Sequence, residues 1–188
     1  MAKIRTILGI DPGTNILGFG VIRLDDHSGK PEYLGMGVLD LRKESDPYEK
    51  LAVISRKVGE LCEEYSVTDL AVESPFYGKN AQVIFKLGRA QGSAIIAAKQ
   101  RGVSVYEYAP RKAKIAICGN GAASKEQVAM MVEKTLGIDV EAKYLDATDA
   151  LAIAMCHYYQ LTNPMTSTVA ATSWEKFIAA NPDRISHS

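Results

Sequence analysis

The sequence predicts an α/β domain in which helices flank a mixed β-sheet. Near the N-terminus, three β-branched and apolar segments, residues 6–10, 18–24 and 33–41, follow one another across short turns. This pattern is typical of three sequential antiparallel strands. From residue 46 onward, helical and strand patterns alternate, which indicates parallel strands joined by crossover helices. The sheet should therefore combine an antiparallel meander with parallel strands.

The first expected helix begins at Asp46. An aspartate caps a helix N-terminus well, Pro47 suits the first helical position, and Glu49 can complete a capping box. Apolar residues then recur at intervals of three and four, so that they share one face of the helix. This apolar stripe consists of Leu51, Ile54, Val58, Leu61 and Tyr65.

The later elements continue the alternation. We expect a strand over residues 69–72, a helix over 79–99, a strand over 103–108 and a last helix from Asp146 to about residue 161. A glycine-rich turn over 118–122 precedes Ser124, which can cap another helix with Gln127 as its capping-box partner, and Gly137 ends that helix. Residues 163–188 are small and polar, so we expect one domain over 1–162 and a partly disordered tail over 163–188.

The composition favours a cytoplasmic protein. The chain has 188 residues, 47% of them hydrophobic, but its apolar runs are too short for a membrane span. We expect no secretion signal, because the N-terminus enters a strand pattern directly. The three cysteines, Cys62, Cys118 and Cys156, are widely spaced and fit reduced thiols better than disulfides or a metal site.

The formal charge of zero hides a strongly basic segment. Residues 76–125 contain nine basic residues and one acid, Glu107, which gives this segment a net charge of +8. Most charged stretches are simply solvated helix surfaces. Such an imbalance within a neutral chain nevertheless favours a surface that faces a polyanion. The basic residues are Lys79, Lys86, Arg89, Lys99, Arg101, Arg111, Lys112, Lys114 and Lys125.

Four carboxylates stand at the ends of apolar elements. Asp11 and Glu73 each close a strand, so they would emerge at the same sheet edge if the two strands are neighbours. Asp146 and Asp149 are three residues apart and share a helix face. Crowded carboxylates repel one another unless a cation compensates, and oxygen ligands without His or Cys favour Mg²⁺, which Mn²⁺ can replace. Two such ions ~3.5–4 Å apart can activate water and stabilise a leaving oxygen at phosphorus.

Each of these acids also has a simpler explanation. Asp146 and Asp149 can cap a helix and favour its dipole, which is the better account of that pair alone. Asp11 can be an ordinary turn aspartate before Pro12 and Gly13, and Glu73 an exposed strand end. The loop over residues 137–145 adds Asp139 and Glu141 close to the pair. The metal-site hypothesis therefore depends on the set of four rather than on any one acid.

Four segments of the chain resemble, in order, the signature segments of the RuvC family, the bacterial Holliday-junction resolvases. They are GIDPGTNILGFGVI, VESPFYGKNAQVIFKLGRAQG, EYAPRKAKIAICGNGAASKEQV and DATDALAIAMCH, and they extend from about residue 7 to 157. The resemblance implies a ribonuclease-H-like fold with a five-stranded mixed sheet. It also implies a metal-dependent homodimeric endonuclease that nicks opposed strands of a four-way DNA junction symmetrically, leaving 5′-phosphate and 3′-hydroxyl ends.

The resemblance also assigns roles to individual residues. It carries the four catalytic, metal-binding acids onto Asp11, Glu73, Asp146 and Asp149. It implies a junction-wedge aromatic at Phe76, with Tyr77 as a weaker candidate, and partners of two kinds, a RuvA-type junction-binding scaffold and a RuvB-type branch-migration motor. Basic residues are expected to contact DNA phosphates at Lys79, Arg111, Lys112, Lys114 and Lys125. His157 can orient a ligand or simply end a helix.

Two other functions remain open at this point. GIDPGTNILGFG also resembles the phosphate-binding hairpin of actin-like ATPases, although those proteins generally have two such lobes and this chain shows one hairpin. The second alternative is a module that grips branched DNA without cutting it. A protein that had lost catalysis would be expected to have lost one of the four acids, and all four are present.

Overall fold

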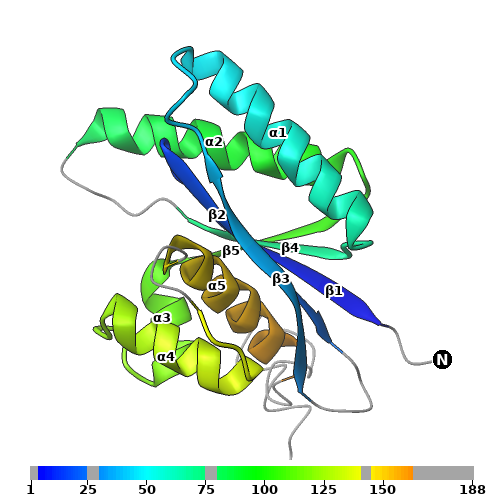
Figure 1. The fold of residues 1–188 in the computed structure, drawn as a ribbon, viewed down its shortest axis with the longest axis vertical. Coiled ribbons are helices and arrows are strands. Elements are labelled where there is room, and N and C mark those ends of the chain that lie inside the picture. Colours follow the sequence, from blue (N-terminus) through cyan, green and yellow to red (C-terminus); the bar gives the residue numbers. More distant parts are fainter. Residues whose placement is uncertain (1–3, 25–29, 75–79, 141–144, 163–188) are drawn as a thin grey trace, which may run out of the picture. The chain divides into compact units, whose positions relative to one another are not determined.

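The computed structural model describes residues 4–24, 30–74, 80–140 and 145–162 (Figure 1). The chain divides into two units, residues 1–158 and 159–188. The predicted tail over 163–188 lies outside the described residues. Among the described residues, none of the helices has both the length and the apolar character needed to cross a membrane.

A five-stranded mixed sheet forms the centre of the first unit. Its strand order is β3-β2-β1-β4-β5. β1 pairs antiparallel with β2 and parallel with β4, β2 pairs antiparallel with β3, and β4 pairs parallel with β5. The predicted meander and the predicted parallel strands are both confirmed. The strands are β1 (Arg5–Asp11), β2 (Ile16–Leu24), β3 (Pro31–Asp40), β4 (Asp69–Glu73) and β5 (Ser104–Tyr108).

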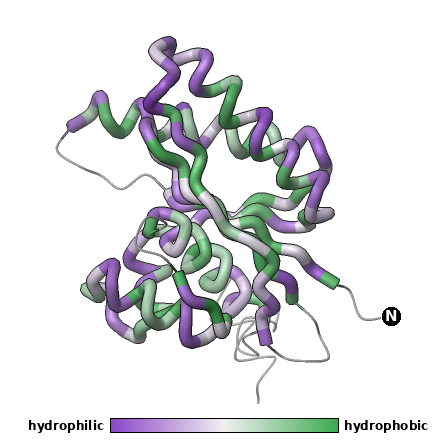
Figure 2. Tube along the Cα trace, in the orientation of Figure 1, coloured by the Kyte–Doolittle hydropathy of each residue, from purple (hydrophilic) through white to green (hydrophobic). Residues whose placement is uncertain are grey.

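Helices cover both faces of this sheet (Figure 1). α1 (Pro47–Glu64) and α2 (Ala81–Lys99) pack together on one face. α3 (Pro110–Cys118), α4 (Lys125–Leu136) and α5 (Leu145–Thr162) lie on the other. Figure 2 shows hydrophobic residues on the strands and on the helix sides that meet them. The arrangement is the α/β architecture that the sequence predicts.

The two-residue repeat of a strand decides which side chains face which helices. In β1, Leu8 and Ile10 belong to the buried cluster beneath α1 and α2. Gly9 therefore faces the opposite side, where it meets α5, and Asp11 continues on that side. In β4, Leu70 and Val72 belong to the same buried cluster, so Glu73 also points toward the α5 face. Asp11 and Glu73 thus share both an edge and a face of the sheet.

The start of α1 follows the prediction with one change. The Asp46 carboxylate accepts a hydrogen bond from the Tyr48 backbone N–H at 2.8 Å, as an N-cap should. The backbone N–H of Asp46, however, donates to the Glu44 side chain at 3.0 Å and not to Glu49. Of the predicted stripe, Ile54, Val58 and Leu61 are fully buried, while Leu51 and Tyr65 are half-buried.

The sequence prediction missed α3. The helix begins with Pro110 at its first position, buries Ala113 and Ile117 four residues apart, and ends at Gly119, whose φ is 70°. The helix was missed because its nine residues include three basic ones and give only a weak apolar pattern. The features that could have predicted it are Pro110 at the first position and the single buried pair four residues apart. The next helix, α4, is confirmed in detail, with a capping box between Ser124 and Gln127 and a left-handed Gly137 at its end.

Glycines let α5 lie directly on β1 and β2. A Cβ atom at Gly9 would lie 2.0 Å from the Ala150 carbonyl oxygen, and one at Gly18 would lie 2.0 Å from the Asp146 carbonyl oxygen. Both neighbours are backbone atoms that cannot rotate away. These two glycines therefore fix how closely the first turns of α5, which carry Asp146 and Asp149, approach Asp11.

We predict that Gly18→Ala destabilises the protein by about 3 kcal/mol, because the new methyl group must push the α5 backbone away from the sheet. Gly35→Ala is the matched control on β3, since its Cβ would meet the hydroxyl end of the flexible Tyr65 side chain at 2.9 Å. Urea unfolding measures both. Equal losses of stability in the two variants would contradict the role of this close approach.

Candidate metal centre

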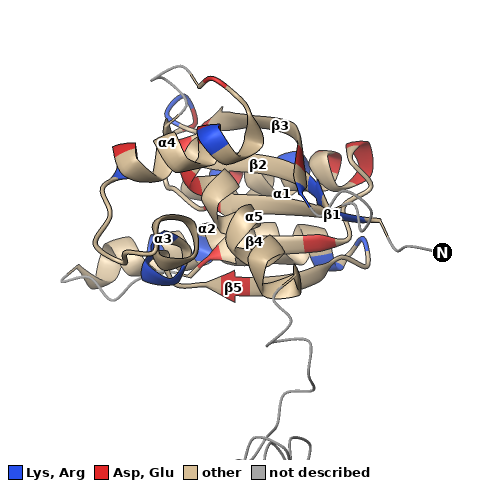
Figure 3. Cartoon of the chain, turned by 90° about the horizontal axis from the view of Figure 1, so that it is seen from below, with Lys and Arg blue, Asp and Glu red and all other residues tan. Residues whose placement is uncertain are grey.

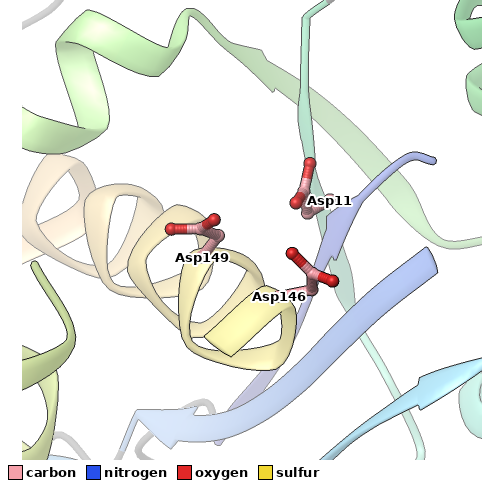
Figure 4. Close-up of side chains that lie close together, drawn as sticks. All are labelled: Asp11, Asp146 and Asp149. Atoms are coloured by element: carbon pink, nitrogen blue, oxygen red, sulfur yellow. The ribbon is translucent and has the colours of Figure 1, made fainter. Parts of the chain in front are cut away.

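Three aspartates gather where β1 ends and α5 begins (Figure 4). One carboxylate oxygen each from Asp11, Asp146 and Asp149 lies within 4.8 Å of the other two, and all three residues are half-buried. Asp11 is the last residue of β1, and the helical spacing of three places Asp146 and Asp149 on one face of α5. Three side chains separated by up to 138 positions in the chain thus form one cluster, which we call the aspartate cluster.

Glu73 lies beside the aspartate cluster. β1 and β4 are parallel neighbours with Ile10 opposite Val72, so Asp11 and Glu73 follow on adjacent strands at the same edge. After burial, the negative charge of Glu73 is the largest cause of the raised pKa of Asp11. The four predicted acids are therefore brought together, with Glu73 beside the three aspartates.

The electrostatics of the cluster call for a cation. Burial, reinforced by Glu73, Asp149 and Asp146, raises the pKa of Asp11 from 3.8 to about 8. Burial and the charge of Asp149 raise the pKa of Glu73 from 4.5 to about 7. Ionising both carboxylates near neutral pH is therefore costly without a cation. A divalent cation between them would offset the repulsion and the loss of solvation. An all-carboxylate donor set of this kind fits Mg²⁺ or Mn²⁺.

Lys125 supplies part of the missing positive charge. It is the first residue of α4, and its Nζ lies 2.6 Å from Asp149 Oδ2 and 3.5 Å from Asp146 Oδ1. The lysine side chain is 55% exposed, whereas that of Asp149 is 18% exposed. A single ammonium group can balance only one carboxylate, so the repulsion among the four acids is relieved only in part.

Three of the other predicted basic residues, Arg111, Lys112 and Lys114, lie on α3, where Figure 3 shows lysines and arginines in blue. Lys114 donates a hydrogen bond from Nζ to the Ala123 carbonyl at 2.7 Å, and its charge lowers the pKa of Glu73, which places it near the acids. Lys112 lies over the Tyr108 ring, 5.2 Å from its centre. Arg111 packs beside Gly121 in the turn that follows α3. The predicted Phe76, Tyr77 and Lys79 lie outside the described residues.

His157 has no part in the aspartate cluster. It is buried in α5, its Nδ1 lies 2.7 Å from the Tyr108 hydroxyl, and its ring stacks on Tyr106 with centres 4.2 Å apart. Its Nε2 lies 3.8 Å from Asp69, which begins β4, whereas Glu73 ends that strand. His157 is therefore a buried core residue, and neither of its two expected roles, orienting a ligand or ending a helix, is confirmed.

Sequence reasoning missed one contact that shapes the site. Lys50 in α1 donates from Nζ to the Thr14 carbonyl at 3.1 Å and to Asn15 Oδ1 at 3.4 Å. It thereby holds the turn that follows Asp11. The two partners are 36 and 35 positions apart from Lys50, and a lone lysine on a charged helix face gives no signal of such a contact.

We predict that the metal-free protein loses stability as pH rises from about 4 to about 8. The folded pKa of Asp11 is raised, so folding takes up a proton in this range, and the stabilisation present at low pH disappears as pH passes about 8. At pH 8 in EDTA, Asp11→Asn should melt about 2–6 °C above the parent protein, and at pH 4 the two should melt alike. Thermal unfolding across this range measures the difference. A difference in melting temperature that does not grow with pH would contradict the raised pKa of Asp11.

Known proteins are similar to this chain in sequence and in fold. The family model described as "Crossover junction endodeoxyribonuclease RuvC" matches residues 7–157. Proteins of that name from Bacteroides fragilis and Christiangramia forsetii are 48% and 46% identical, over 97% and 96% of this chain and 97% and 93% of their own. Among solved structures, Thermus thermophilus RuvC is similar with a TM-score of 0.74 and 33% identity, covering 83% of this chain and 95% of that one.

The same Thermus thermophilus protein has also been solved in complex with a Holliday junction substrate. That structure matches with a TM-score of 0.73 and 31% identity, covering 83% of this chain and 94% of the other. The family match over residues 7–157 includes all four acids, Asp11, Glu73, Asp146 and Asp149. This chain belongs to the RuvC family of crossover junction endodeoxyribonucleases.

Proposed function

We propose that this protein resolves four-way DNA junctions with a divalent-metal centre built from Asp11, Glu73, Asp146 and Asp149. As a member of the family, the chain is an endodeoxyribonuclease. The observation that carries the assignment of the centre is the approach of three carboxylate oxygens within 4.8 Å, with Glu73 beside them. We assign the site two Mg²⁺ ions, which Mn²⁺ can replace, because the donors are all hard oxygens.

The side chains divide the work in this proposal. Bound Mg²⁺ supplies the Lewis acidity that activates water and stabilises the leaving oxygen during in-line attack at phosphorus. The four acids hold the cations, and the close contact of α5 with the sheet keeps them in place. Lys125 is more than half exposed, so its ammonium group can turn from Asp149 to a phosphate oxygen of the substrate. The products carry 5′-phosphate and 3′-hydroxyl ends.

The remaining predicted basic residues contact the DNA backbone in this proposal. Arg111, Lys112 and Lys114 lie on α3, on the same side of the sheet as the acids. Phosphate contacts of this kind position the substrate without reading its sequence. We propose that Phe76, or less favourably Tyr77, stacks on an unpaired base of the junction. Lys79 would contact the DNA backbone nearby.

We propose that α2 forms a homodimer interface. Its outer face exposes Phe85 (70%) and Ile96 (56%), and these flank Gly88 and Gly92, where an added Cβ atom would meet none of the described atoms within 4 Å. The four positions recur at intervals of three and four and therefore share one face. Small residues between two large apolar ones allow close approach of a second helix. A dimer of this kind provides two active sites for paired nicks.

We predict that Phe85→Glu converts the dimer into a monomer, because a charge would replace a large apolar side chain at the centre of the contact. Analytical ultracentrifugation at micromolar concentration measures the mass. Met130→Glu is the matched control, since Met130 is 61% exposed on α4, on the other side of the sheet. A dimer that survives Phe85→Glu would place the interface elsewhere.

The family also suggests partners and a location. We propose that the protein acts in the cytoplasm with a RuvA-type junction-binding scaffold and a RuvB-type branch-migration motor. Support for this step comes from membership of the family alone. We also propose that the nuclease domain ends at residue 162 and that residues 163–188 form a tail.

A labelled four-way junction and a linear duplex of matching sequence test the proposed function. With Mg²⁺ we expect paired cuts at symmetric positions in the junction, with products that a ligase can seal, while EDTA abolishes the cuts and the duplex stays intact. Equal cutting of the duplex, or cutting in EDTA, would contradict the proposal. The ATPase alternative is not favoured, because the nuclease family matches residues 7–157.

A further inference from the structure

A second polar site lies on the face of the sheet opposite the aspartate cluster. A hollow of about 450 Å³ opens between the turn after β1, the start of α1 and the middle of α2. Its floor includes Leu41, Ile54 and Ala90, which belong to the buried cluster beneath α1 and α2. The polar side chains that line it are those of Thr14, Asn15, Ser45, Tyr48, Lys50, Lys86 and Arg89. We call this hollow the α1–α2 pocket.

The described residues that line the α1–α2 pocket carry only positive charge. Three of them, Lys50, Lys86 and Arg89, are basic, and none of the lining residues described is an aspartate or glutamate. Lys50 is held by Thr14 and Asn15, so its charge stays at the pocket. Lys86 and Arg89 are three residues apart on one face of α2, and neither forms an ion pair with any described carboxylate. Three cations that line one pocket, with no described carboxylate among the lining residues, favour an anion.

The α1–α2 pocket is next to the aspartate cluster along the chain. Thr14 and Asn15 follow Asp11 by three and four residues, a span of at most ~15 Å. The turn at residues 13–15 therefore separates the two sites at one edge of the sheet. A polyanion that crosses this edge from the α5 face reaches the pocket within a few nucleotides.

We infer that the α1–α2 pocket holds a phosphodiester group of the DNA strand that passes the metal centre. Lys86 and Arg89 would contact the phosphate oxygens, and Arg89 can offer two parallel N–H donors. Tyr48, which is 68% exposed at the same pocket, offers a ring on which a neighbouring base can stack. This inference rests on the proposed function, and it extends the DNA-contacting surface beyond α3 to the opposite face of the sheet.

The double variant Lys86→Ala/Arg89→Ala tests the inference. We expect about a tenfold rise in the Kd for junction DNA and a decrease of about 1–2 in the slope of log K against log salt, because each lost phosphate contact removes released counterions. Lys99→Ala is the control, since Lys99 is an exposed lysine at the end of the same helix and does not line the pocket. Thermal unfolding should show that both variants are folded.

The outcomes separate three explanations. If the parent protein cuts and binds junctions but the double variant keeps the Kd and salt slope of Lys99→Ala, the inference is overturned and the proposed function stands. If the parent protein does not bind junctions, the proposed function itself fails. ATP and inorganic phosphate are titrated in parallel, and saturation of the pocket by ATP at micromolar concentration, lost in the double variant, would assign it to a free nucleotide and overturn the inference.

Discussion

Replacing Asp11 by asparagine is expected to lower the rate of junction cleavage by about a thousandfold or more while leaving junction binding intact. Asp11 ends β1 beside the other three acids, and its pKa is raised further above its ordinary value than that of Glu73. Asparagine keeps the shape but removes the charge that a divalent cation requires. Without a properly held cation, the transition state loses several kcal/mol of stabilisation. Each 1.36 kcal/mol lost slows the reaction about tenfold.

Binding should not suffer from this change. A carboxylate repels phosphate, so its removal leaves the affinity for junction DNA equal or slightly higher. Asp139→Asn is the matched control, because Asp139 is an exposed acid in the loop before α5 and is not one of the four predicted metal ligands. Single-turnover cleavage and gel-shift titration measure both properties. If Asp11→Asn cuts at the parental rate, the assignment of Asp11 to the metal centre is wrong.

Replacing Lys125 by alanine should change two properties in opposite directions. Its ammonium group lies 2.6 Å from Asp149 and 3.5 Å from Asp146, where it would compete with a bound cation for the same carboxylates. Lys125→Ala should therefore bind Mn²⁺ more tightly, by about tenfold in Kd, in the absence of DNA. Cleavage should nevertheless slow by about a hundredfold, because the phosphate loses a positively charged donor.

This pair of effects distinguishes two roles for the lysine. A residue that only holds the folded site together would lower both Mn²⁺ affinity and cleavage when removed. Lys134→Ala in the last turn of α4 removes the same charge from the same helix and should change neither. Calorimetric titration of Mn²⁺ into the free protein, together with single-turnover cleavage, separates these outcomes. Weaker Mn²⁺ binding by Lys125→Ala would contradict its role as a competing counter-charge.

Much of the candidate site could be predicted from the sequence because it depends on simple periodicities. A buried apolar strand that ends in Asp11 and another that ends in Glu73 place both acids at one edge once the strands are neighbours. A spacing of three places Asp146 and Asp149 on one helix face. The structure confirms that these elements meet. Their catalytic and metal-binding roles stay predictions until they are measured.

Other parts depend on contacts between distant segments, which no local pattern announces. The glycines at positions 9 and 18 are unremarkable in sequence, yet they determine how closely α5 approaches the sheet. His157 ends a sequence motif beside the catalytic pair, but it lies two helical turns further along α5, where its ring stacks on that of Tyr106. The α1–α2 pocket joins Lys50, Lys86 and Arg89, and only folding brings α1 and α2 together around it.

Anomalous scattering from crystals soaked in Mn²⁺ tests the central claim most directly. We predict an anomalous peak at ~2.0–2.5 Å from carboxylate oxygens of Asp11 and at least one of Asp146 and Asp149, with the Lys125 ammonium group displaced from Asp149. The peak should vanish in crystals of Asp11→Asn. A map of a cleavage-competent crystal with Mn²⁺ bound elsewhere, and Lys125 still paired with Asp149, would contradict the proposed centre.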